Sequence, residues 1–159
     1  MNDNYRRLVQ MADDIFSVKS DPTQLDVDEN VIRRLKLIHP ATVSEYSDEN
    51  GPAAWLIVIP ITEDLMRKFV DGSITERELY DQTPETGKYD AIYLSSALVL
   101  EEYRRKGIIK ELAIKAIEEI RKDHPIRYLV TWPFTTEGNL ASEKISELSS
   151  LPLLKRKKE

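Results

Sequence analysis

A short basic turn, Arg104-Arg105-Lys106-Gly107, separates an apolar stretch from a long amphipathic one. The N-terminus of a helix exposes unpaired N–H groups and a partial positive charge, so a sequence selected for stability alone would place Asp or Glu there. Cations at that point each cost about 0.3–1 kcal/mol unless an anion, such as a phosphate, binds among the amides. Gly107 would let the backbone approach such an anion. The alternative interpretation is a solvated basic loop, partly neutralised by Glu101 and Glu102.

The flanking segments predict the elements that position this turn. Residues 91–100 are almost continuously apolar, which is typical of a central strand in a parallel sheet with both faces covered. After the turn, Glu111 precedes Lys115 and Glu118 precedes Lys122 by four residues, an orientation that favours surface ion pairs on a helix. The other face of this predicted helix carries an apolar stripe: Ile108, Ile109, Leu112, Ala113, Ala116, Ile117 and Ile120. Residues 127–132 then predict a second, parallel strand, reached by a right-handed crossover.

Residues 98–109, with the sequence LVLEEYRRKGII, resemble the acetyl-CoA-binding segment of the GNAT N-acetyltransferases, whose core pattern is Gln/Arg-x-x-Gly-x-Gly/Ala. Arg104 and Gly107 fit this pattern, whereas Ile109 stands where the family has Gly or Ala. The branched side chain of Ile109 would either crowd the pyrophosphate or face the core of the protein. The resemblance continues to Asn139, at a position where the family often has Asn after its fifth strand.

This resemblance implies an α/β fold of the α+β kind, with a GNAT-like mixed sheet, a central βαβ acyl-CoA-binding unit and flanking helices. It also implies acetyl-CoA as the cosubstrate, attacked directly by an amine. Backbone amides would hold the cofactor and stabilise the carbonyl oxygen of the thioester. The implied cofactor-binding residues are Ala97, Leu98, Val99, Arg104, Arg105, Lys106, Gly107, Ile108, Ile109 and Asn139.

The proton of the attacking amine needs a carboxylate or a histidine within reach, or a water chain to one. The predicted central strand offers one tyrosine and two serines but no acid after Asp90. Glu45 and Tyr46 are the alternative candidates, although an exposed hairpin residue is the simpler interpretation of Glu45. Ser146 falls where many members of the family have a Tyr that protonates the leaving thiolate. Solvent or another tyrosine, such as Tyr128, would then supply that proton, or the protein does not catalyse transfer.

The rest of the chain predicts the order of the elements. We expect a single domain over residues 1–159, and Asn50-Gly51 predicts a tight hairpin turn between strands at 41–46 and 53–59. Thr62 predicts a helix cap, and Thr75 with Glu78 predicts a capping box. The expected parts are a helical N-terminal part (1–40, broken at Asp21-Pro22), a β-hairpin (41–61), inserted helices (62–81), the βαβ cofactor unit (91–132), and a C-terminal helix with a short strand or tail (138–159).

Little strand material follows the last predicted helix, since only Leu151-Pro152-Leu153-Leu154 remains where the family normally has two strands. The sheet is then either short or completed by a partner chain. An exposed sheet edge invites pairing with another strand, so a homodimer is expected on the second interpretation.

Composition excludes several classes of function. The chain has no cysteine, which excludes disulfides, thiolate metal sites and an acyl-cysteine intermediate, and its two histidines, His39 and His124, predict surface or helix-end positions rather than a metal site. The net charge of -5 argues against nucleic-acid binding, and we interpret the basic run at 155–158 as a solvated tail. With no apolar run of membrane-spanning length and no signal-peptide pattern, we expect a cytoplasmic protein without a membrane partner.

Three functions stay open at this point. The first is an acetyl-CoA-dependent N-acyltransferase that acts on a small-molecule or peptide amine. The second is a non-catalytic regulatory protein that binds acyl-CoA or another nucleotide through the same fold. The third is a protein-interaction module with no small ligand.

Overall fold

The computed structural model describes residues 3–18, 28–133 and 136–156. At its centre is a five-stranded sheet in the order β1-β2-β3-β4-β5. Strands β1, β2 and β3 are antiparallel neighbours, whereas β4 runs parallel to β3 and β5 runs parallel to β4. The predicted mixed sheet is therefore confirmed. The strands span Val43–Asp48 (β1), Gly51–Ile61 (β2), Ala91–Val99 (β3), Tyr128–Thr131 (β4) and Leu153–Lys155 (β5).

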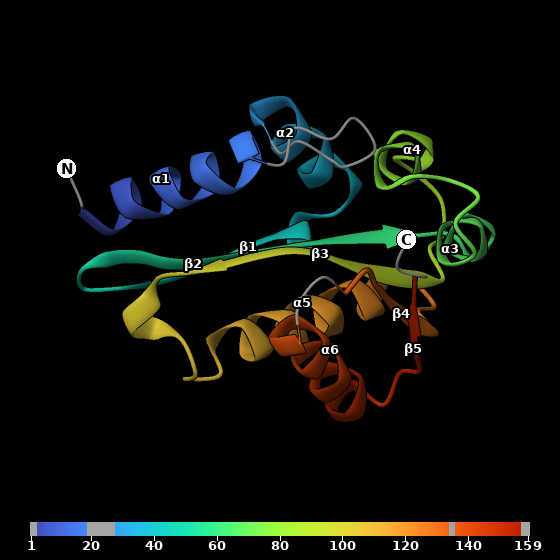
Figure 1. Cartoon of the computed structure of the whole chain (residues 1–159). Coiled ribbons are helices and arrows are strands. Elements are labelled where there is room, and N and C mark those ends of the chain that lie inside the picture. Colours follow the sequence, from blue (N-terminus) through green and yellow to red (C-terminus); the bar gives the residue numbers. More distant parts are fainter. Residues whose placement is uncertain (1–2, 19–27, 134–135, 157–159) are drawn as a thin grey trace.

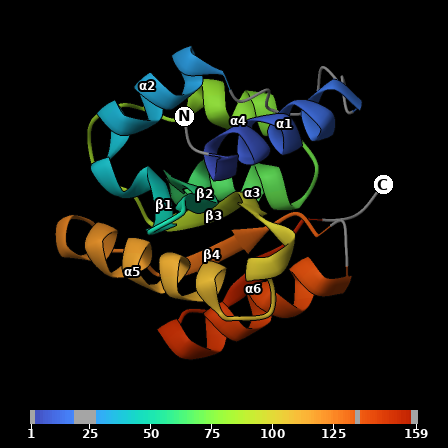
Figure 2. The same ribbon diagram turned by 90° about the vertical axis from the view of Figure 1, so that its left-hand side faces the viewer.

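Helices cover both faces of this sheet (Figures 1 and 2). One face carries α1 (Asp3–Val18), α2 (Glu29–Ile38) and α4 (Glu76–Gln82), and the other carries α5 (Ile108–Asp123) and α6 (Thr136–Ser149). Helix α3 (Glu63–Val70) follows the C-terminal end of β2. Two short 3-10 helices complete the fold, η1 at Pro40–Thr42 and η2 at Glu101–Tyr103.

Several local signals in the sequence form the structures that they predict. The hairpin turns at Glu49-Asn50, and Gly51, which begins β2 opposite Asp48, has a φ of 103° that favours glycine. The side chain of Thr62 accepts a hydrogen bond from the backbone N–H of Leu65, which caps α3. Thr75 and Glu78 form the complete capping box at the start of α4, with reciprocal hydrogen bonds of 2.9 and 3.0 Å.

Some predicted boundaries are wrong. Residues 40–42 form η1 instead of starting a strand at Ala41, because Pro40 suits the first position of a helix and the ring of His39 accepts a hydrogen bond from the Ala41 N–H. The last helix begins at Thr136, two residues before the predicted start of the C-terminal part at residue 138. The predicted break at Asp21-Pro22 lies outside the described residues.

Two polar side chains near the ends of helices make contacts that differ from the predicted ones. Lys122 bonds Glu119 at 3.0 Å, one turn away along α5, rather than the predicted Glu118. His39 lies at a helix end as predicted, but it is buried, because its Nε2 contacts the Asp123 carboxylate at 2.7 Å and so joins α2 to the end of α5.

The basic run at 155–158 is not a solvated tail throughout, because the guanidinium of Arg156 is buried. It lies between two aromatic rings, 4.8 Å from the centre of Phe69 and 4.7 Å from that of Trp132. Its Nε and Nη2 donate to the carbonyl oxygens of Phe69 and Ile74 at 3.0 and 2.8 Å. Arg156 thus connects the end of β5 to α3, and Lys157 and Lys158 lie outside the described residues.

The hydrophobic core has two parts. The larger part fills both sides of the sheet and includes fully buried Phe69, Tyr93 and Ile117. A smaller cluster of Leu8, Ala53 and Leu100 lies where α1 crosses β2 and the end of β3. Helix α1 therefore packs beside the segment that leaves β3 and enters η2.

Candidate functional site

The parallel strands β3 and β4 are paired over only four residues, from Ala91–Tyr128 to Leu94–Thr131. Strand β3 continues for five more residues, Ser95 to Val99, with no partner on the β4 side in the described part of the chain. Backbone N–H and C=O groups along this edge are strong hydrogen-bonding groups that need partners. The separation of β3 and β4 therefore leaves a row of peptide groups that can pair with an extended ligand.

A β-bulge lies at the point of separation. Ile57 of β2 pairs with Ser96 and the next residue, Val58, pairs with Leu94, so Ser95 is an extra residue without a partner in β2. The Oγ atom of Ser95 is buried and has no hydrogen-bond partner among the described residues. Bulges redirect the backbone and are frequent next to active sites. An unsatisfied buried hydroxyl is costly, which also favours a ligand at this position.

The basic turn connects the free edge of β3 to α5. Gly107 is the N-cap of α5 with φ 76° and ψ 13°, and no side chain caps the helix there. Arg105 also has a positive φ, 64°, which is uncommon for a residue with a side chain. Among the described residues, none accepts a hydrogen bond from the backbone N–H of Ile108, Ile109 or Lys110. These N–H groups can therefore bind an anion.

Side chains from two other elements hold the segment just before this turn. Arg7 of α1 makes two hydrogen bonds to the carboxylate of Glu102, of 2.5 and 2.6 Å. The hydroxyl of Tyr103 donates to the Asp48 carboxylate at 2.6 Å, which ties η2 to the β1-β2 hairpin. Glu102 therefore forms its ion pair with Arg7 rather than with a cation of the basic turn, which reduces its part in the predicted neutralisation of the turn.

The model of the acetyltransferase (GNAT) family matches residues 24–145 of this chain. The chain belongs to the GNAT family. No curated protein matches the chain. The matched residues include the free edge of β3, the basic turn and most of α6.

The structure brings most of the predicted cofactor-binding residues of this GNAT protein together. Ala97, Leu98 and Val99 lie on the free edge of β3, and residues 104–109 form the turn and the first residues of α5. Asn139 lies on α6, and its Oδ1 is buried without a hydrogen-bond partner among the described residues. Their roles in binding stay predictions.

Ile109, the departure from the family pattern, is partly buried and packs against the larger part of the core. This contact favours the second of the two interpretations of its branched side chain. Gly107 has room for a Cβ, which would lie 3.6 Å from Cε of Lys110, so its left-handed backbone rather than crowding requires glycine.

The predicted catalytic residues lie in different places. Tyr46 is at the same end of the sheet as the basic turn, since it pairs with Ala54, which pairs with Val99. Glu45 is exposed, and its two carboxylate oxygens accept hydrogen bonds from Trp55 Nε1 at 2.7 Å and from Ser47 Oγ at 3.0 Å. Glu45 is thus engaged within the hairpin in this structure.

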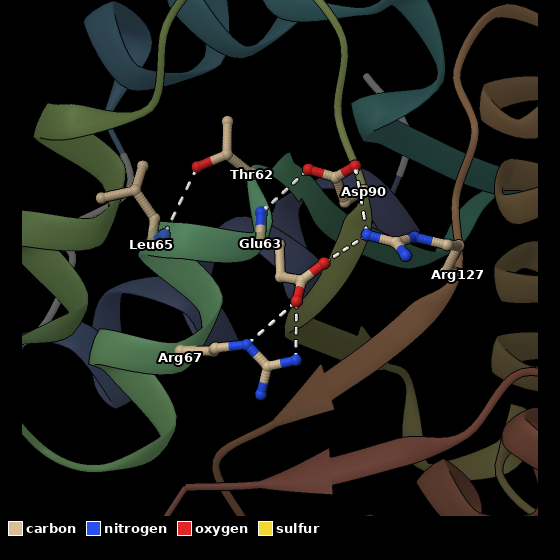
Figure 3. A network of polar contacts seen from close by, with 6 residues as sticks. All are labelled: Thr62, Glu63, Leu65, Arg67, Asp90 and Arg127. Carbon is tan, nitrogen blue, oxygen red and sulfur yellow. Dashed lines mark hydrogen bonds and ion pairs between the residues drawn. The ribbon is translucent and has the colours of Figure 1, made fainter.

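Tyr128 is the first residue of β4, at the opposite end of the strands from the basic turn. A polar network occupies this end, as Figure 3 shows. The carboxylate of Glu63 accepts a hydrogen bond from Arg127 and two more from Arg67. The backbone N–H of Glu63 donates to the Asp90 carboxylate at 3.0 Å. The hydrogen bonds from Arg67 lower the pKa of Glu63. The network joins α3 to the starts of β3 and β4, which favours a structural role for this end of the sheet.

Sequence reasoning missed one buried acid near the separation of the strands. Glu76, the first residue of α4, is 8% exposed and accepts a hydrogen bond of 2.6 Å from the hydroxyl of Tyr93. Burial, followed by the negative charge of Glu76, raises the pKa of Tyr93. The neighbouring capping box gave a reason to place Glu76 on the surface, so no signal in the sequence pointed to its burial.

Two further groups of side chains bear on the chemistry. The Oγ of Ser146 bonds the carbonyl oxygen of Leu151 at 2.5 Å, so this hydroxyl supports the turn after α6. Among the side chains that the structure describes, no three His, Asp or Glu lie close enough together to hold a metal ion. In the same residues, no helix is both long enough and apolar enough to cross a bilayer.

Proposed function

We propose that this protein is an acetyl-CoA-dependent N-acetyltransferase that transfers the acetyl group to an amine by direct attack. The observation that carries the proposal is the free edge of β3 from Ser95 to Val99, which leads straight into the uncapped start of α5. A ligand with amide groups along one part and phosphates at the next fits this order of sites. The pantetheine arm and the pyrophosphate of acetyl-CoA have that order.

The basic turn supports the phosphate end of this proposal. The N–H groups of Ile108, Ile109 and Lys110 would donate hydrogen bonds to the pyrophosphate, and the positive end of the α5 dipole would also attract it. Arg104 has a second role, because its Nε donates to the carbonyl oxygen of Val99 at 3.3 Å and so fixes the turn to the end of β3. The side chain of Arg105 is exposed and is available for a phosphate.

Unsatisfied polar atoms support the pantetheine end. Ser95 Oγ on β3 and Asn139 Oδ1 on α6 are both buried without a partner in the described residues. Ser95 is the first residue of β3 after its pairing with β4 ends, and Asn139 lies on α6, the helix that follows β4. Amide groups of a bound pantetheine arm would give these two atoms partners and remove the cost of their burial.

The chain's own groups also suit the chemistry of acetyl transfer. Backbone N–H groups on the free edge near Ser95 would stabilise the negative charge that develops on the thioester oxygen. Of Glu45, Tyr46 and Tyr128, we propose Tyr46 as the residue that takes up the proton of the amine, because it lies at the same end of the sheet as the basic turn. Glu45 is engaged by Trp55, and Tyr128 lies at the opposite end of the strands. Solvent would protonate the leaving thiolate, since Ser146 is engaged by Leu151.

The test has a binding arm and a catalytic arm. Calorimetry with acetyl-CoA should give saturable binding, and release of free CoA thiol should be measured with a panel of small amines and lysine-containing peptides. Gly107→Asp should strongly weaken both signals, and Lys155→Ala, an exposed ion-pair residue on β5, should leave both unchanged. Absence of acetyl-CoA binding to the folded wild-type protein would overturn the proposal.

A regulatory protein that binds acyl-CoA without efficient transfer is the second candidate. It is favoured by one specific observation, the engagement of both Glu45 and Ser146 in hydrogen bonds within the fold. Tight binding of acetyl-CoA with no thiol release for any amine tested would select this candidate over the first.

A further inference from the structure

Glu102 stands two residues before the basic turn, yet its charge is directed away from the turn. Arg7 Nη1 contacts Glu102 Oε2 at 2.5 Å and Arg7 Nη2 contacts Oε1 at 2.6 Å, so the guanidinium engages both oxygens. The pKa of Glu102 is lowered to about 2, mainly by the hydrogen bond from Arg7, with a smaller contribution from the charge of Lys106. The carboxylate therefore lies within electrostatic reach of the turn but is compensated by a residue of α1.

The carboxylate of Asp48, which contacts Tyr103 just before the turn, is likewise engaged in hydrogen bonds within the fold. Asp48 accepts hydrogen bonds from the hydroxyl of Tyr103 at 2.6 Å and from the backbone N–H of Asn50 at 2.8 Å. The Nζ of Lys106 lies over the ring of Tyr103, 5.7 Å from its centre. Within the described residues, no carboxylate forms an ion pair with the cations of the turn or with Lys110.

We propose that Arg7 is a positioning residue for acetyl-CoA, which acts by holding Glu102 so that the basic turn keeps its positive charge for the phosphates. This inference rests on the proposed function. Without Arg7, the uncompensated carboxylate of Glu102 repels an incoming phosphate and is attracted to Lys106. Affinity for acetyl-CoA then falls although no residue in contact with it has changed.

A purely structural role would look different. The side chains of Arg7 and Glu102 are 44% and 52% exposed, and exposed ion pairs contribute little to folding stability. Helix α1 has a separate anchor, because Leu8 is fully buried in the smaller cluster with Ala53 and Leu100. Loss of the ion pair is therefore expected to change binding more than folding.

A double-mutant cycle on the full chain tests the proposal. Acetyl-CoA affinity is measured by calorimetry at low ionic strength for the wild type, Arg7→Ala, Glu102→Gln and the double variant. Arg7→Ala should weaken binding about two- to fivefold, the effect of one surface charge. Glu102→Gln alone should not weaken binding, and adding it to Arg7→Ala should return the affinity to within about twofold of the wild type.

Three further readouts separate the proposed role of Arg7 from a general effect of lost positive charge or of lost folded structure. Arg33→Ala makes the same charge change on α2, where Arg33 bonds its helix neighbour Asn30, and should leave the affinity unchanged. Melting temperatures should stay within about 4 °C of the wild type. In the transfer assay, Arg7→Ala should raise KM for acetyl-CoA with kcat unchanged, and the effect should shrink at high salt.

The outcomes are distinct. Wild-type binding that Arg7→Ala leaves unchanged overturns the role of Arg7 and leaves the proposed function standing. A double variant as weak as Arg7→Ala shows that Arg7 acts as a cation itself or through α1, which overturns the role given to Glu102. A wild-type protein that does not bind acetyl-CoA overturns both proposals.

Discussion

Replacement of Gly107 by Asp and by Asn separates an effect of charge from an effect of shape at the start of α5. Gly107 has φ 76°, a conformation that costs an ordinary L-residue about 1–2 kcal/mol but that Asn and Asp adopt more readily. A Cβ at this position lies 3.6 Å from Lys110 Cε and 3.8 Å from its Nζ, which is ordinary contact. The two variants therefore have nearly the same backbone strain and the same size.

Stability and affinity should then change in opposite directions between the two variants. A negative charge at a helix N-terminus stabilises it by about 0.3–1 kcal/mol, so Gly107→Asp should unfold at a slightly higher denaturant concentration than Gly107→Asn. Two unit charges 4 Å apart repel by about 1 kcal/mol in water and by about 4 kcal/mol near a protein surface. With a phosphate at the amides of Ile108 to Lys110, Gly107→Asp should therefore bind acetyl-CoA at least about fivefold more weakly than Gly107→Asn.

Calorimetry and urea unfolding of both variants, at low and at high salt, measure these differences. The gap in affinity should narrow at high salt because screening weakens the repulsion. Equal affinities of the Asp and Asn variants for acetyl-CoA would show that no phosphate lies near this helix start, and the reasoning about the basic turn would be wrong.

Three other changes give expected outcomes. Ile109→Gly should lower acetyl-CoA affinity and unfolding free energy together, because Ile109 packs on the core and glycine itself costs a helix about 1 kcal/mol; an affinity that rises while stability falls would contradict this. Burial lowers the pKa of His124, so the unfolded chain binds a proton at this residue more readily than the folded protein does. The free energy of unfolding should therefore not depend on His124 well above pH 6.5 and should fall as the pH drops below that value. Urea unfolding at pH 7.5 and 5.5 should show a smaller loss of this free energy for His124→Gln than for the wild type. Arg156→Ala should lower the free energy of unfolding by about 3 kcal/mol or more, because it removes two buried hydrogen bonds from a charged donor and leaves the Ile74 carbonyl unsatisfied, whereas Lys155→Ala should change it by at most about 1 kcal/mol.

The central unit of the fold could be predicted because its signals are local. The apolar run at 91–100, the stripe on α5 and the capping box at Thr75 each depend on residues close in sequence, and each forms the expected element. The basic turn before Gly107 likewise identified the start of α5 as a candidate phosphate site. These patterns work because helix periodicity and caps are decided within a few residues.

The remaining features depend on contacts between distant residues. The Arg7–Glu102 pair joins positions 95 apart, so charge counting around the turn could not show which carboxylates are already engaged. Arg156 stands in a run of cations that resembles a solvated tail, and only the rings of Phe69 and Trp132 explain its burial. Glu76 is buried because Tyr93, on β3, supplies its hydrogen bond.

The contact between Arg156 and α3 also has a consequence for the order of folding. Its hydrogen bonds to Phe69 and Ile74 close loops of 87 and 82 residues, and contacts at such separations form slowly because loop closure must precede them. Helices α3 and α4 can form early from their own caps, but the carbonyl groups of Phe69 in α3 and of Ile74 between the two helices bond Arg156 only after β5 has joined β4. We therefore expect α3 and α4 to be among the last parts of the chain to gain full protection from hydrogen exchange during refolding.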